Sequence, residues 1–313
     1  MSTVSSDLPL TVPEEVADGV WAFAQHDGSW WVNTAGFLVG AASGGRSSVT
    51  AIDSCATEAR TRQLLDAIGG VTSNPVRTLV NTHAHGDHTY GNCLFDEAVI
   101  VAHERCREDL KEDTFLGQTT HVWDPPPRWG NLTKAYPTVT FSHRLRLWVD
   151  DDPVELVHIG VPAHTRGDVV AWLPGRSVLF TGDLAFNGGM PMLMSGSVTG
   201  ALSGMEFLRS FGAETVVPGH GRPCGPEIFD VHERYYRFVL DTATAARDAG
   251  LAPLEAARQT DLGEFSELLD SERIVLNLHR AYADLSGESD LDIMAALNDA
   301  IAYNGGRPLR CVA

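Results

Sequence analysis

Four ionisable side chains crowd into six positions directly after a short segment that predicts a strand. The segment is residues 77–81, and the crowded positions are His83, His85, Asp87 and His88. In extended backbone, side chains two residues apart project to the same side, so the first two imidazoles point together. Inside an apolar core, each of these polar tips would need its own buried partner. The spacing therefore predicts a metal site at the end of a strand, and so a fold in which a sheet presents functional loops at its edge.

Three further candidates follow other predicted strands: His164, Asp183 and His220. Asp183 comes shortly after the predicted strand 177–181, and His220 comes shortly after 214–217. Each of the three, taken alone, is typical of an ordinary turn or a capped strand end. Together they lie where an α/β sheet places its functional loops, which favours a shared site.

Five imidazoles and two carboxylates suit two divalent ions. This set of nitrogen and oxygen ligands favours Zn²⁺, with iron or manganese as alternatives. A carboxylate such as that of Asp183 can bridge both ions, and such a pair lowers the pKa of a water between them toward about 7. A hydroxide nucleophile would then form at neutral pH without any Ser or Cys.

The order His83-x-His85-x-Asp87-His88, then His164, Asp183 and His220, resembles the metallo-β-lactamase-fold hydrolase superfamily over about residues 16–225. The resemblance implies an α/β fold, an αββα sandwich, with a dinuclear site at one edge of its sheets. It implies that His83, His85 and His164 bind one ion. Asp87, His88 and His220 would then bind the other, and Asp183 would bridge the two.

Two more residues near the motif are candidates for supporting roles. Asp53 follows an early predicted strand and resembles the family's acidic residue that orients a ligand imidazole. Tyr90 follows the motif by two positions and is a candidate O–H donor to a developing oxyanion. In the expected mechanism the hydroxide attacks a carbonyl, while the second ion and Asp87 handle the proton and the leaving-group charge.

The residue types narrow the reaction. Members of the family that hydrolyse β-lactams usually have Cys or Ser where this chain has Asp183, which argues against that activity. We therefore expect hydrolysis of a thioester, ester or lactone of a small molecule. The alternatives are a phosphoester or sulfate-ester hydrolase, a mononuclear iron dioxygenase on the same fold, and a non-enzymatic member that only binds a ligand.

The chain divides by composition into residues 1–225, expected to form the hydrolase domain, and 226–313, expected to form a helical extension. Short apolar strands dominate the first part, and amphipathic helical patterns dominate the second. The helices are predicted over residues 229–249, 253–260, 271–285 and 290–304. Their apolar stripes predict either core or a dimer face, so a homodimer through this extension is one possible partnership. Residues 114–135 have little periodicity and predict a long loop or lid.

Aromatic and methionine side chains in the predicted loops near the motif suggest a pocket for a small apolar substrate. The candidate pocket residues are Trp30, Trp31, Trp123, Trp129, Phe186, Met190 and Met192. For each one, a place in the core is an equally good interpretation.

Charge limits the partners. The 313 residues include 41 acidic and 23 basic residues, a formal net charge of −18, with no run of Lys or Arg. Such a chain repels phosphate backbones and anionic lipid surfaces, so we expect neither a nucleic-acid nor a membrane partner. There is no cationic leader before an apolar stretch, and the five cysteines form no CxxC pair, so we expect a cytoplasmic protein.

Overall fold

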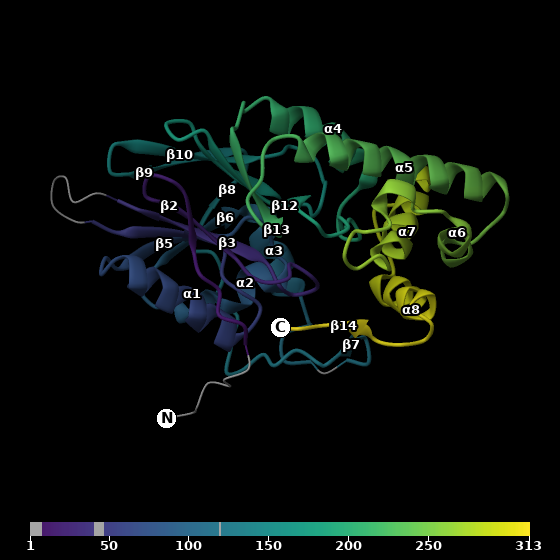
Figure 1. Cartoon of the computed structure of the whole chain (residues 1–313), viewed down its shortest axis with the longest axis horizontal. Coiled ribbons are helices and arrows are strands. Elements are labelled where there is room, and N and C mark those ends of the chain that lie inside the picture. Colours follow the sequence, from purple (N-terminus) through teal and green to yellow (C-terminus); the bar gives the residue numbers. More distant parts are fainter. Residues whose placement is uncertain (1–7, 41–46, 119) are drawn as a thin grey trace.

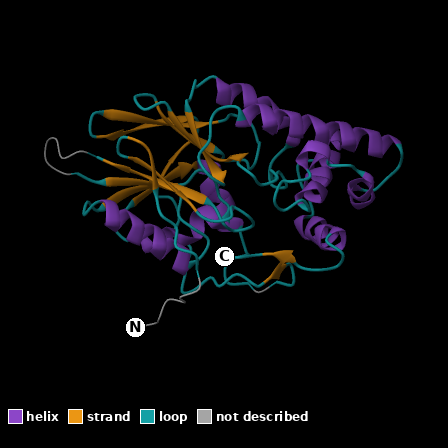
Figure 2. Ribbon diagram, viewed as in Figure 1, coloured by secondary structure: helices purple, strands orange, loops and turns teal. Residues whose placement is uncertain are grey.

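The computed structural model of the chain describes residues 8–40, 47–118 and 120–313 and has two β-sheets packed face to face (Figures 1 and 2). The first sheet has the order β1-β2-β3-β4-β5-β6-β8, and the second has the order β13-β12-β11-β10-β9. The strands of the first sheet are β1 (Glu14–Ala17), β2 (Val20–Ala24), β3 (Thr34–Val39), β4 (Val49–Ile52), β5 (Val76–Val80), β6 (Val99–His103) and β8 (Val139–Phe141). Those of the second are β9 (Arg144–Val149), β10 (Asp152–His158), β11 (Val169–Leu173), β12 (Val178–Phe186) and β13 (Thr215–His220).

Alternation along the strands divides the core into layers. In β2, Val20 and Ala22 face the second sheet, where they join a buried cluster with residues such as Leu156 of β10. Phe23 belongs to a different cluster, on the outer face of the first sheet. Since successive side chains of a strand point to opposite faces, one strand contributes to both layers.

Helices cover both outer faces. On the first sheet, α1 (Glu58–Val71) buries Leu64 and Ile68 against the outer cluster, and the side chain of Thr57 caps its N-terminus. On the second sheet lie α4 (Val198–Arg209) and α5 (Ile228–Asp248), whose residues pack with those of β10 to β13. A further helix of the first part, α3 (Glu104–Glu112), packs through Cys106 and Leu110 beside the metal motif. This arrangement confirms the αββα sandwich expected from the sequence.

The C-terminal helices form a block at one side of the sandwich (Figure 1). After α5 come α6 (Pro253–Gln259), the short 3₁₀ helix η2 (Gly263–Phe265), α7 (Arg273–Ser286) and α8 (Ile293–Tyr303). Their buried residues belong to the same cluster as the outer face of the second sheet, so the block shares that core. Asp284 of α7 accepts hydrogen bonds from the backbone N–H of Val198 (2.7 Å) and the hydroxyl of Ser197 (3.0 Å), which ties α7 to the start of α4.

The end of the chain returns to the long loop between α3 and β8. There β14 (Leu309–Arg310) pairs in parallel with β7 (Trp123–Asp124). In its described residues, the loop predicted over 114–135 is thus irregular except for this two-residue strand, which pairs with the end of the chain.

Two features of the fold differ from the sequence prediction. Helix α4 was not predicted, because its apolar residues alternate with glycine and serine, which weaken a helical pattern. Strands β12 and β13 run further than predicted, to Phe186 and His220, so Asp183 lies within its strand and His220 ends its strand. Among the described residues, no helix is long and apolar enough to cross a bilayer.

Candidate metal centre

The loop after β5 and a single helical turn carry the motif. His83 and His85 lie in the loop, and the short helix α2 (Gly86–Thr89) carries Asp87 and His88. A Cβ on Gly86 would lie 2.3 Å from ring carbons of Tyr90, so only glycine allows the turn to pack this closely on that ring. The turn places the last two motif residues beside the first two.

The other three candidates come from the second sheet. His164 lies in the loop between β10 and β11, Asp183 lies in β12, and His220 ends β13. Strands β12 and β13 are parallel neighbours, which brings Asp183 and His220 to the same edge of the sheet. A Cβ on Gly219 would lie 2.0 Å from Oδ1 of Asp183, so β13 needs glycine there to pass the carboxylate.

One group of ring nitrogens surrounds a point between the two sheets. Nδ1 of His85 lies 3.2 Å from Nε2 of His83 and 2.7 Å from Nε2 of His164. Oδ2 of Asp183 lies 3.2 Å from the same nitrogen of His164. These four side chains offer ligand atoms that all lie within 4.8 Å of one another.

A second group lies next to the first. Oδ2 of Asp87 lies 3.2 Å from Nε2 of His220 and 3.8 Å from Nε2 of His88. The carboxylate of Asp183 faces this group too, since its Oδ1 is 3.0 Å from Nε2 of His88 and its Oδ2 is 3.3 Å from Nε2 of His220. Asp183 therefore stands between the two groups.

Two atoms of this cluster are buried without a hydrogen-bond partner among the described residues. They are Nε2 of His88 and Oδ1 of Asp183, which lie 3.0 Å apart but in an orientation that makes no hydrogen bond. Buried polar atoms are normally satisfied, so an exception calls for a missing partner. The donor set of imidazole and carboxylate is the set that divalent transition metals take, and the two groups can hold such ions.

Protonation divides the cluster in the same way. Burial lowers the pKa of His83 and His85, and lowers that of His164 to about 3, so these rings are neutral and keep a free lone pair. Burial alone would also lower the pKa of His220, but the carboxylates of Asp183 and Asp87 outweigh it and raise that pKa to about 9. Without a cation, protons thus hold the second group together, and a metal ion would replace them.

Each imidazole is held by its outer nitrogen, which fixes the ring orientation. Backbone carbonyls hold two of them, with Nδ1 of His164 2.6 Å from the oxygen of Met192 and Nδ1 of His220 3.0 Å from that of Gly28. Nε2 of His85 lies 3.1 Å from Oγ of Ser195. Such contacts select the tautomer and aim the other nitrogen at the centre of the cluster.

Asp53 holds the remaining two rings. Its Oδ2 lies 2.8 Å from Nδ1 of His88 and accepts a hydrogen bond from the hydroxyl of Thr82, which in turn lies 3.1 Å from Nδ1 of His83. Its backbone φ is +61°, a left-handed value that is uncommon outside glycine and is held here by these bonds. This carboxylate was expected beside a ligand imidazole, and it lies against the ring of His88, a candidate ligand.

A cavity of about 780 Å³ opens beside the cluster and reaches His85, Asp87, Asp183 and His220. Five of the predicted pocket residues line it: Trp30, Trp31, Trp123, Phe186 and Met192. The other two do not. Met190 is fully buried in the core, and Trp129 packs edge-on against Trp31 with its N–H donating to a backbone carbonyl.

Tyr90 lines the cavity but its hydroxyl is already engaged. The hydroxyl lies 3.0 Å from both carboxylate oxygens of Asp113, and burial raises its pKa. A phenol that donates to a carboxylate is not free to donate to a substrate. The structure therefore argues against the oxyanion role expected from the sequence.

Several cavity residues were missed by the sequence analysis, because no local pattern marks them. Ser195 follows Asp183 by twelve positions in an irregular loop, and Phe115 lies in the loop after α3. Arg273 and Arg280 come from α7, in the part of the chain that was expected to form a helical extension. Only the packing of α7 against the sandwich brings them here.

Fold and site together place the chain among known proteins. Residues 47–220, more than half of the chain, match the sequence profile of the metallo-beta-lactamase superfamily. The chain belongs to this superfamily, and it is a metal-dependent hydrolase.

Two curated relatives cover different shares of the chain. One is the 2,4-dinitroanisole O-demethylase subunit alpha of Nocardioides sp. (strain JS1661), 26% identical over 76% of this chain and 68% of the relative. The other is the acyl-coenzyme A thioesterase MBLAC2 of Bos taurus, 27% identical over 47% of this chain and 57% of the relative. The chain thus spans little more than half the length of this thioesterase.

Two solved structures share the fold. A metallo-beta-lactamase from Pontibacter korlensis is 19% identical, with a TM-score of 0.57, and the match covers 72% of this chain and 99% of that one. The sec-alkylsulfatase Pisa1 from Pseudomonas sp. is 17% identical, with a TM-score of 0.65, over 88% of this chain and 50% of that one. At these identities the likeness concerns the fold alone.

Proposed function

We propose that the chain is a dinuclear metal-dependent hydrolase that cleaves a thioester, ester or lactone of a small apolar substrate. The observation that carries the proposal is the carboxylate of Asp183, whose two oxygens face two separate groups of ligand atoms. His83, His85 and His164 would hold one ion, and Asp87, His88 and His220 the other. Zn²⁺ is the first candidate, with iron or manganese as alternatives.

A pair of divalent ions at this site would lower the pKa of a water between them and polarise a substrate carbonyl. The chain's own residues then do the rest. Asp87 lines the cavity and stays ionised, because burial, which raises its pKa, is outweighed by His88 and His220, which bring it to about 2. Its carboxylate can accept a hydrogen bond from the attacking water and orient it.

The aromatic lining of the cavity supports an apolar substrate. The ring of Trp123 packs against those of Trp30 and Trp31, with centroids 5.0 and 5.7 Å apart, and the three line one wall. The name of one relative, acyl-coenzyme A thioesterase, supports an ester-like bond as the point of attack.

The test is to reconstitute the protein with Zn²⁺, Mn²⁺ or Fe²⁺ and screen acyl thioesters, lactones and aryl esters. We expect two ions per chain and hydrolysis without oxygen uptake. One iron per chain with oxygen consumption would favour the dioxygenase instead. Two tightly bound ions without turnover of any substrate class would favour a binding protein.

A further inference from the structure

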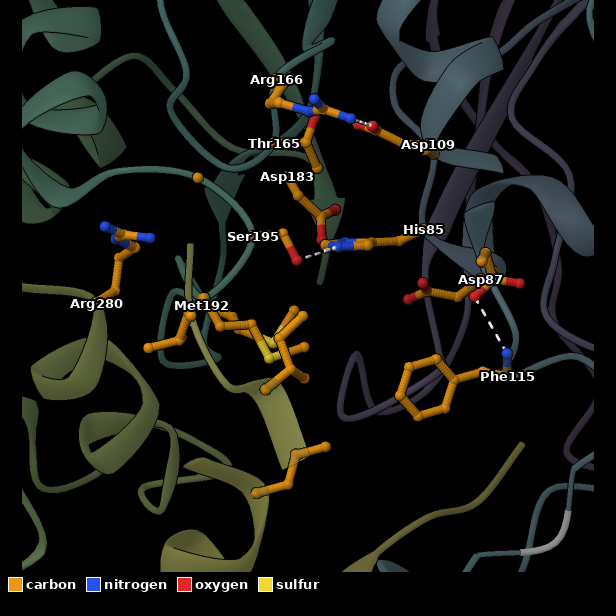
Figure 3. Close-up of a pocket in the computed structure, with 18 of the residues that line it drawn as sticks. His85, Asp87, Asp109, Phe115, Thr165, Arg166, Asp183, Met192, Ser195 and Arg280 are labelled. Carbon is orange, nitrogen blue, oxygen red and sulfur yellow. Dashed lines mark hydrogen bonds and ion pairs between the residues drawn. The ribbon is translucent and has the colours of Figure 1, made fainter. Parts of the chain in front are cut away.

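The cavity beside the cluster has walls of two kinds. Aromatic side chains form the first, and they are Trp30, Trp31, Phe115, Trp123 and Phe186. Charged side chains form the second, and Figure 3 shows some of them, with Arg166 against Asp109 at one end and Arg280 beyond Met192. The balance of these charges decides which substrates can enter.

Carboxylates outnumber cations in the lining. Apart from Asp87 and Asp183 of the cluster, six carboxylates line the cavity: Asp109, Glu112, Asp113, Asp284, Glu288 and Asp290. The lining has only three arginines, which are Arg166, Arg273 and Arg280, and no lysine among the described residues.

All three arginines are already engaged by the protein. Arg166 is paired with Asp109, and Arg273 lies 2.8 Å from Asp270 in a largely buried pair. Arg280 lies 2.9 Å from Asp284, and its other nitrogens donate to the backbone carbonyls of residues 288 and 289. Each guanidinium of the described lining thus already faces a carboxylate of the protein.

Three of the six carboxylates are exposed to solvent, and two of these three are unpaired among the described residues. Glu288 and Asp290 follow α7, are exposed, and form no ion pair within 4.0 Å among the described residues. The exposed carboxylate of Glu112 lies 3.7 Å from Arg166, which Asp109 already neutralises. Outside the metal cluster, the described lining thus has more unpaired carboxylates than unpaired cations, in a chain that carries a net charge of −18.

We propose that this cavity selects substrates whose leaving group is apolar and either uncharged or cationic, and that it rejects anionic leaving groups. The inference deepens the proposed function and rests on it. An apolar group gains by burial against the aromatic wall. An anionic group in the same place would face several carboxylates, and the arginines of the lining already face carboxylates of the protein. Binding of an anionic leaving group is therefore disfavoured.

The first test compares two thioesters that share the acyl group and the scissile bond. These are S-benzoyl pantetheine, which is uncharged, and benzoyl-coenzyme A, which adds an anionic nucleotide. With the metal-loaded protein at low salt we expect kcat/KM to favour the uncharged thioester by at least about tenfold, a ratio that falls as salt is added. Equal or faster hydrolysis of the coenzyme A thioester, at all salt concentrations, would overturn the inference.

A charge-reversed double variant sharpens the test. Glu288→Lys with Asp290→Lys should lower the preference for the uncharged thioester by about tenfold, because it replaces the open carboxylates with free cations. The matched control is Asp66→Lys with Asp96→Lys, which makes the same change in net charge at exposed positions outside the cavity lining. Its preference should equal that of the wild type. An equal effect of both double variants would show net charge alone at work and would overturn the inference.

A binding test separates this inference from the proposed function. Three naphthalene probes, bearing a trimethylammonium, a hydroxymethyl or a sulfonate group, are titrated into the metal-free protein while tryptophan fluorescence is followed. We expect the sulfonate to bind at least about tenfold more weakly than the other two. If the metal-loaded protein hydrolyses no ester or thioester, the proposed function fails and these affinities alone decide the inference. Equal or tighter binding of the sulfonate would contradict it.

Discussion

The guanidinium carbon of Arg273 lies 4.4 Å from the centroid of the Trp30 ring. Arg273 begins α7, and Trp30 lies in the loop between β2 and β3, so this contact joins the two ends of the chain at the wall of the cavity. The indole N–H of Trp30 donates to Glu272 at 2.7 Å and fixes the same ring from its edge. The C-terminal helices are therefore part of the site and not only a support for the fold.

Replacing Arg273 should destabilise the protein more than a surface arginine would. The side chains of Arg273 and Asp270 are 2% and 7% exposed, so Arg273→Met leaves a buried carboxylate without its partner. We expect the free energy of unfolding to fall by about 3–5 kcal/mol, measured by urea denaturation. The double variant Arg273→Met with Asp270→Asn should recover part of this loss. If the single and double variants are equally stable, the unpaired carboxylate of Asp270 is not the cause of the loss.

Removing the charge of Asp183 should separate the metals from the fold. In Asp183→Asn we expect metal content and kcat/KM to fall together, the latter by more than about 100-fold, because the amide offers one weak oxygen where the carboxylate offered two. Circular dichroism of the metal-free variant should match that of the metal-free wild type. Unaltered turnover in this variant would refute the bridging role.

Exchanging the carboxylate of Asp53 for an amide should affect one ion more than the other. Asparagine tolerates the left-handed backbone at this position, so the loop keeps its shape. Its N–H₂ group would face Nδ1 of His88, however, and would drive the ring proton onto Nε2, the nitrogen that points into the cluster. We expect Asp53→Asn to lose affinity for the second ion by about 10- to 100-fold, measured as metal per chain during dialysis. Two ions held at wild-type affinity would contradict this expectation.

Tyr90→Phe distinguishes a structural hydroxyl from a catalytic one. Since the hydroxyl donates to Asp113, its removal should lower the free energy of unfolding by about 1.5–3 kcal/mol. The loss of an oxyanion donor lowers kcat by about 10²- to 10³-fold. The change in kcat of Tyr90→Phe should be much smaller than this. The phenyl ring of the variant keeps its packing beside Trp31 and Trp129, so the substitution tests the hydroxyl alone. A large loss in kcat with unchanged stability would restore the oxyanion role.

His232 makes stability depend on pH away from the metal centre. Its Nε2 accepts a hydrogen bond from the backbone N–H of Phe186 at 2.9 Å, and burial lowers its pKa to about 4. Because this pKa lies below the unfolded value of about 6.5, the unfolded chain binds the proton first. The stabilisation by His232 is therefore complete above about pH 6.5 and is lost as the pH falls to about 4, a difference of about 3 kcal/mol.

The measurement compares unfolding free energies at pH 7 and pH 4.5. Stability should fall more steeply toward pH 4.5 in the wild type than in His232→Gln. The exposed His143→Gln serves as the control and should follow the wild type. If the free energy of unfolding falls equally between pH 7 and pH 4.5 in all three proteins, His232 is not the cause of the pH dependence.

Local sequence pattern is enough to predict the layers of the sandwich and the part of the site that lies within residues 83–88. Alternating apolar residues define the two faces of a strand, and the close spacing of His83, His85, Asp87 and His88 forces those side chains together whatever the rest of the chain does. The family motif then named His164, Asp183 and His220 as their partners.

The way these parts meet depends on the packing of segments that are distant in the sequence. The parallel pairing of β12 with β13 brings Asp183 and His220 to one edge, and the direction of the Tyr90 hydroxyl follows from where α3 places Asp113. The walls of the cavity come from α7 and from the loop held by β14, whose contacts join residues far apart in sequence. The spacing of residues in the sequence predicts short-range geometry, because the periodicity of a helix or strand decides which neighbouring side chains share a face. Contacts between distant segments depend on packing and on ion pairs, and no periodicity in the sequence marks the residues that make them.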